Sequence, residues 1–314
     1  MRVRKALLQT TMLAGIVGAT FLSIRDAKAA EPVFAPNYAA VDGINGKIEG
    51  LGGSLAHKGL YGARGSLSIP LGGLYGLQYD GELGSWDSKF YGKIGAHLFW
   101  RDPSRGLIGL YAGHTHWSKY GGVHVTQVAA EGEYYWDRLT LHGVAGVEFG
   151  NTATSTASSI VPHVPGTAAP GITTTMIDGY DVKTRFFDQI DLKYYWTDNS
   201  DTYIGHRYLG GKHALALGGE AALPVGVGGG RMLTAFVEGR IGEDDFQGVW
   251  GGLKAYFGQR DKTLIRRHRE DDPGPVDSKP SISNSHFTSI GTTLTCGADG
   301  FRTPTTCEIP VAED

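Results

Sequence analysis

The chain has 314 residues and a net charge of −3, with 48 Gly, 12 Phe, 6 Trp and 15 Tyr. No basic stripe appears, so nucleic acid is not an expected partner. Beyond the N-terminal region, no stretch reaches the roughly 20 consecutive apolar residues of a transmembrane helix. Many glycines together with Tyr and Trp favour a protein of closely packed, turning strands.

Residues 1–29 have the pattern of a secretory signal peptide. Residues 2–5 are mostly basic, residues 6–24 are mostly apolar, and Ala27-Lys28-Ala29 provides a small-x-small cleavage site. We expect this segment to be removed, which leaves residues 30–42 as a short periplasmic lead.

About twelve runs between Gly43 and Phe257 alternate apolar and polar residues with the period of two that is typical of strands. The hairpin from Val123 to Gly150, with its turn at Asp137-Arg138, shows this most fully. Its two faces suit either a soluble core or a lipid-facing wall. One face carries Val128, Ala130, Tyr134, Trp136, Leu139, Leu141, Val147 and Phe149, and the other carries Gln127, Glu131, Glu133, Thr140, His142 and Glu148.

Connection lengths and aromatic positions favour the membrane. With both termini in the periplasm, inward connections such as Asp137-Arg138 are short, and the longest connection, Asn151 to Arg185, is an irregular outer loop. Aromatic residues gather beside both sets of turns, as in the two girdles of a membrane barrel. We therefore predict an all-β, transmembrane, antiparallel up-and-down barrel of about twelve strands over residues 43–257, with ten strands as the alternative count.

The last predicted strand, Trp250 to Phe257, contains glycines and ends on an aromatic residue. It is similar to the assembly motif of the outer-membrane β-barrel proteins of Gram-negative bacteria, and the chain resembles that family at the level of its pattern. The resemblance implies a place in the outer membrane, surrounded by lipid and lipopolysaccharide, and insertion by the barrel-assembly machinery. Two departures are that Trp250 stands where the motif usually opens on a polar residue, and that the motif is internal.

Residues 258–314 change character and predict a short periplasmic tail. A densely charged segment, Gln259 to Asp272, precedes a linker rich in Pro and Gly, and Cys296 and Cys307 follow. In an oxidising periplasm two cysteines favour a disulfide, and so short a loop would stabilise the fold by roughly 2–3 kcal/mol. We expect the tail to remain in the periplasm, where it could contact peptidoglycan or another periplasmic partner.

The polar faces of the strands point inward and carry charges of both signs. Burying such charges without water or partners costs several kcal/mol each, so the lumen is either hydrated or filled with ion pairs. A narrow polar pore and a barrel plugged by its own ion pairs both fit this pattern. The candidate pore-lining residues are Lys47, Glu49, Arg64, Asp80, Glu82, Lys93, Arg101, Glu131, Glu133, His142, Glu148, Asp191, Lys193, Glu238, Arg240 and Lys254.

The leading function predicted from the sequence is a porin-like passive channel for small hydrophilic solutes, without enzymatic activity or a cofactor. A structural or adhesive surface barrel without transport is the alternative, and an outer-membrane lipid hydrolase is a third. A hydrolase needs a Ser, a His and an orienting partner on lipid-facing strands. Glu133 and His142 should instead face each other inside the barrel, with no Ser at their height. The solute and the oligomeric state are left open.

Three histidines at the outer end form a candidate metal site. His114 and His116 are two residues apart on one strand and point to the same side, and His124 begins the next strand. Three converging imidazoles would suit zinc or copper. The alternative is that they are exposed interfacial histidines beside Trp117.

Overall fold

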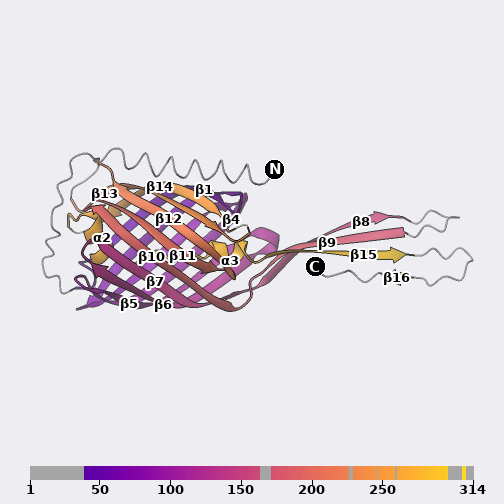
Figure 1. Ribbon diagram of the computed structural model, residues 1–314, viewed down its shortest axis with the longest axis horizontal. Coiled ribbons are helices and arrows are strands. Elements are labelled where there is room, and N and C mark those ends of the chain that lie inside the picture. Colours follow the sequence, from indigo (N-terminus) through magenta and orange to yellow (C-terminus); the bar gives the residue numbers. More distant parts are fainter. Residues whose placement is uncertain are drawn as a thin grey trace, which may run out of the picture.

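The computed structural model describes residues 39–162, 171–225, 229–244, 246–258, 260–295 and 306–308. The predicted signal peptide and most of the lead lie outside these residues. Twelve strands pair antiparallel, each with its neighbour, and β1 pairs with β14 to close the barrel (Figure 1). The barrel strands are β1 (Asn45–Leu55), β2 (Lys58–Gly72), β3 (Tyr75–Trp86), β4 (Lys89–Asp102), β5 (Gly106–Trp117), β6 (Val123–Trp136), β7 (Leu139–Gly150), β10 (Arg185–Thr197), β11 (Ser200–Leu209), β12 (Lys212–Ala222), β13 (Met232–Gly242) and β14 (Gly248–Phe257).

The hairpin of β6 and β7 shows why these residues form a barrel wall. Trp136 pairs with Leu139 across the turn, as predicted, and the alternation then continues without a bulge to Gly150. The apolar face points out of the barrel, and the polar face, including Gln127 and Glu148, is buried inside. The prediction of an antiparallel barrel with a charged interior is therefore confirmed, with twelve strands rather than ten.

Large apolar side chains cover the outside of the barrel. Ile94 and Trp136 each keep 68% of their area exposed, and Ile108 keeps 65%. Contiguous apolar surface of this kind is unfavourable in water. Because ring closure leaves no unpaired strand edge in the wall, the wall can lie in hydrocarbon, and its exterior is a lipid-facing surface. Among the described residues, no helix is both long enough and apolar enough to cross a membrane.

The longest connection forms two strands, β8 (Thr152–Val161) and β9 (Gly171–Asp181), that project beyond the rim of the barrel (Figure 1). Two strands from the end of the chain, β15 (His286–Thr295) and β16 (Thr306–Glu308), join them in the order β16-β15-β9-β8. We call this projecting sheet the arm. The prediction of an irregular loop was wrong because its threonines favour strands once a partner strand lies beside them.

The C-terminal tail passes back through the barrel. Helix α2 (Leu264–Glu270) lies at the end opposite the arm, residues 271–278 run inside the wall, and α3 (Lys279–Ser283) leads into β15 near the arm (Figure 1). The prediction that residues 258–314 form a periplasmic tail is wrong for the described residues that lie inside the barrel. The physical reason is that the charges of the tail find partners among the buried charges of the wall.

Candidate functional site

The candidate site is the barrel lumen together with the part of the tail that fills it. At the short-turn end, the guanidinium of Arg269 on α2 lies 5.1 Å from the ring centroid of Tyr135 and 5.5 Å from that of Tyr195. Arg269 also donates a hydrogen bond of 2.7 Å to the carbonyl oxygen of Leu139. Stacking between rings and a backbone hydrogen bond together fix α2 in the mouth of the barrel.

The neighbouring histidine of α2 joins two further strands. The Nδ1 atom of His268 lies 2.9 Å from the hydroxyl of Tyr195, and its Nε2 atom lies 3.0 Å from the hydroxyl of Tyr256. The helix thus contacts β10 and β14, which occupy different parts of the ring.

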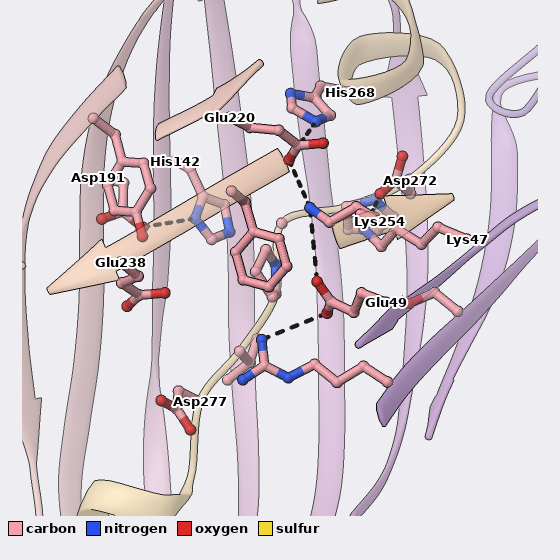
Figure 2. A pocket seen from close by; sticks show the side chains of 18 of the residues that line it. Lys47, Glu49, His142, Asp191, Glu220, Glu238, Lys254, His268, Asp272 and Asp277 are labelled. Atoms are coloured by element: carbon pink, nitrogen blue, oxygen red, sulfur yellow. Dashed lines mark hydrogen bonds and ion pairs between the residues drawn. The ribbon is translucent and has the colours of Figure 1, made fainter. Parts of the chain in front are cut away.

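Midway along the lumen, residues 271–278 form an extended strap, which we call the lumen segment (Figure 2). Asp272 forms an ion pair with Lys47 on β1, and Asp277 lies 3.0 Å from the guanidinium Nη1 of Arg240 on β13. Lys93 on β4 donates a hydrogen bond to the carbonyl oxygen of Val276. The lumen segment is therefore held by strands on several sides of the ring.

Toward the arm, α3 closes the lumen through an ion pair, a hydrogen bond from Ser281 to Glu148 and an apolar contact. The ammonium of Lys279 lies 2.8 and 3.1 Å from the two carboxylate oxygens of Glu82. Ile282 is fully buried in a cluster that includes Trp86 and Trp117, whose rings stack at 4.1 Å. The lumen is thus sealed by charge pairing and by aromatic packing at this end.

A small cavity of about 150 Å³ remains between the lumen segment and the wall. Lys254 bridges two carboxylates there, 2.6 Å from Glu220 and 3.9 Å from Glu49, and His142 faces Asp191 at 3.7 Å (Figure 2). The cavity is smaller than typical ligand pockets of roughly 300–1,000 Å³. Its polar lining suits on the order of ten water molecules.

All of the predicted pore-lining residues point into the barrel, and all but three line this cavity. The other three, Arg101, Glu131 and Glu148, are buried in other contacts. Glu133 and His142 are opposite each other in the register, as predicted. However, Glu133 accepts a hydrogen bond of 2.5 Å from the hydroxyl of Tyr135, whereas His142 faces Asp191.

His97 and Arg207 are two of the strongly paired wall residues that the sequence-based set lacked. His97 lies 2.8 Å from Asp80 and 2.7 Å from Glu131, and it is fully buried. Arg207 donates hydrogen bonds of 2.6 and 3.1 Å to the two oxygens of Asp191. Both residues occupy inward-facing positions of their strands. The alternation of side chains along a strand could have identified them from the sequence. The tail residues had no such signal, because their partners lie on distant strands.

The predicted histidine patch lies on the outer surface of the barrel. His116 is opposite His124 in the register, and the rings of His114 and His124 are 5.6 Å apart. Within the described ranges, no group of three or more His, Cys, Asp or Glu side chains could hold a metal ion. The three histidines thus share one face without forming a ligand set. The predicted disulfide falls outside the described residues, because Cys296 is not described and Cys307 is described only in its backbone.

A polar cluster ties the arm to the rim. Asp178 on β9 accepts hydrogen bonds from Tyr120 in η1 (Lys119–Gly121) and from Thr288 on β15, and lies 2.6 Å from His286 Nε2. Burial alone would raise the pKa of Asp178, but the hydrogen bonds from Tyr120 and His286 outweigh it and lower this pKa below 3.8. The hydrogen bond to Asp178 also raises the pKa of Tyr120 to about 12.

Acid is therefore expected to loosen the arm at this cluster. Because the pKa of Asp178 is lower in the folded arm than its ordinary 3.8, its contribution to stability is present above pH 3.8 and is lost as the pH falls through the folded value. Spin labels at Ser155→Cys and Ser289→Cys, with Cys296 and Cys307 changed to Ser, would report the β8–β15 distance. We expect one narrow distance distribution at pH 5 and a broad one near pH 2. A distribution that stays narrow at pH 2, or an Asp178→Asn variant that keeps the full pH response, would contradict this role of Asp178.

Strand closure, a lipid-facing apolar exterior and a charged interior define a membrane-spanning β-barrel of the outer-membrane type. No protein-family model matches the sequence, and no curated protein matches it. Among solved structures, the chain is similar to the Acinetobacter baumannii outer membrane protein Omp33, with 9% identity over 68% of this chain and 97% of that chain and a TM-score of 0.33.

Two further solved structures show the same level of likeness. The β domain of the Bordetella autotransporter BrkA matches at 13% identity over 71% of this chain and all of that chain, with a TM-score of 0.33. A Pseudomonas aeruginosa FadL homologue matches at 8% identity over 69% of this chain and 89% of that chain, with a TM-score of 0.32. The barrel class rests on the strand pairing and the exterior rather than on these weak likenesses.

Proposed function

We propose that this protein is a non-enzymatic surface anchor of the outer membrane, the structural or adhesive barrel of the sequence-based alternatives. In this proposal the barrel holds the protein among lipid and lipopolysaccharide after insertion by the assembly machinery. The lumen carries the tail from the periplasmic end to the outer face, where the arm is displayed. The observation that supports this proposal most directly is that the tail occupies the lumen from α2 to α3 and then pairs with β9 beyond the rim.

Surface labelling of the tail tests this proposal. In a background with Cys296 and Cys307 changed to Ser, we expect Ser289→Cys on β15 to react with a membrane-impermeant maleimide on intact cells. The matched control is Ser104→Cys in the exposed β4–β5 turn, which should react only after the outer membrane is permeabilised. Labelling of Ser104→Cys on intact cells, with Ser289→Cys protected, would show the reverse orientation and contradict the proposal.

The passive channel for small hydrophilic solutes is the second candidate. The observation that favours it is the charged cavity, large enough for several water molecules, that persists beside the lumen segment. In this form of the proposal the described state is closed, and solutes pass only when the tail has left the lumen. The two candidates differ in what a barrel without its tail should do in a planar bilayer.

A further inference from the structure

The arm has one long strand whose outer edge is unpaired among the described residues. β8 pairs with β9 along its whole length, from Thr152 opposite Asp181 to Val161 opposite Ile172, and no described strand lies on its other side. Nine of its ten residues are exposed, and Ile160 and Val161 keep 69% and 57% of their area exposed.

An edge strand of this kind is a template for another strand. It presents a row of N–H and C=O groups, and proteins usually protect such edges with charged residues, proline or a bulge. β8 has none of these, because its sequence is TATSTASSIV and its register with β9 has no shift. Strand addition at an exposed edge is an established mode of recognition, in which the main chain provides the hydrogen bonds.

We propose that the partner of this edge is the β8 strand of a second copy of the chain, paired antiparallel. β8 carries no charge, so pairing it with itself places no like charges opposite each other. Two identical edges meet as an isologous pair about a two-fold axis. In such an antiparallel pair every outward donor within the overlap meets an acceptor, provided that the axis passes through a residue. The axes with the longest overlap pass through Thr156 or Ala157, and each leaves one end residue of β8 unmatched.

A parallel pair of the same two edges about a two-fold axis does not satisfy this condition, because the axis then places residues of the same number opposite each other. In both copies the outward-pointing N–H and C=O groups belong to the same alternate residues of β8. In a parallel ladder each residue bonds the residues just before and just after the one opposite it, so these groups would not face each other. Antiparallel pairing has a geometric consequence, because β8 runs outward from the rim at Thr152. The two barrels then point in opposite directions, so the second copy belongs to a facing membrane.

This inference rests on the proposed function, since β8 must lie outside the cell. The test uses the full chain in two populations of phospholipid vesicles, one with a donor dye and one with an acceptor dye. Outward-facing arms are counted through labelling of Ser289→Cys by impermeant maleimide. We expect mixing to tether the two populations. Ser158→Lys on the β8 edge should reduce tethering at least tenfold, whereas the matched Thr174→Lys on β9, which is paired on both sides, should leave it unchanged.

A disulfide reports the register independently of any variant that weakens pairing. With Cys296 and Cys307 changed to Ser, a single Thr156→Cys lies on or beside the axis, where paired residues are close enough for a disulfide. We expect oxidation to link copies only between tethered vesicles. Links within untethered vesicles would show pairing in one membrane and overturn the proposal, as would a Thr156→Cys that stays unlinked while outward arms are counted. Absence of outward arms on intact cells would instead reject the proposed function.

Discussion

Deletion of residues 258–314 is expected to turn a silent barrel into a conducting one. The full chain should give no more current across a planar bilayer than protein-free lipid, because α2, the lumen segment and α3 fill the ring. Without the tail, wall charges such as Arg240 and Glu82 lose their tail partners and take up water instead, since leaving them dry would cost several kcal/mol each. Water then fills the lumen and ions pass.

The matched control is a deletion of residues 286–314, which removes β15 and β16 but keeps the plug of α2, lumen segment and α3. This variant should remain silent, so current in the longer deletion can be assigned to the emptied lumen rather than to a damaged arm. Both variants should still show a heat-dependent mobility shift on a gel, as a folded barrel does. A folded but silent 258–314 deletion would mean that the wall closes on its own ion pairs, and it would remove the channel candidate.

Glu82→Leu is expected to be among the most destabilising single changes in the wall, by roughly 3–5 kcal/mol. Glu82 is buried and contacts two cations, Lys279 of α3 at 2.8 Å and Arg64 Nε at 3.1 Å. Its removal leaves a buried lysine beside an apolar side chain. Urea unfolding in lipid vesicles, followed by tryptophan fluorescence near Trp86 and Trp117, measures the loss.

Two comparisons separate charge pairing from general damage. The double variant Glu82→Leu/Lys279→Leu should recover much of the lost stability, because neither charge is then left alone. Arg105→Ala, which removes the 82%-exposed surface partner of Asp102, should cost less than about 1 kcal/mol. If the double variant is as unstable as Glu82→Leu alone, the contact between wall and tail is not a coupled pair.

The barrel could be predicted from the sequence because its determinants are local. A residue and its neighbour two positions away report which face of a strand is apolar, and Asp137-Arg138 marks a turn without reference to the rest of the chain. The same logic placed Lys47, Glu82 and Arg240 inside the lumen. The same alternation puts His97 and Arg207 on the inner face, although neither was named among the pore-lining candidates.

The tail could not be placed in this way. Asp272 and Asp277 lie in a stretch with no periodicity, and what orders them is Lys47 and Arg240, which are far away in the sequence. A charged segment beside a Pro- and Gly-rich linker has the composition of a solvated tail. The lumen becomes a better environment than water for these two carboxylates only once the barrel has closed and its buried cations need partners. The Thr-rich stretches of β9 and β15 were likewise ambiguous until each had the other as a neighbour.

Three covalent connections join the arm to the rest of the chain, and they determine how it would carry a mechanical load. β8 continues from β7, β9 leads into β10, and β15 continues from the chain that passes through the lumen to α2. A pull on the tip would divide among two wall strands and one internal strap, whose Lys279, Asp277 and Arg269 contacts resist withdrawal one after another. Because the ladder hydrogen bonds of an antiparallel sheet lie across the strands, the force would shear the ten β9–β15 residue pairs together rather than peel them singly.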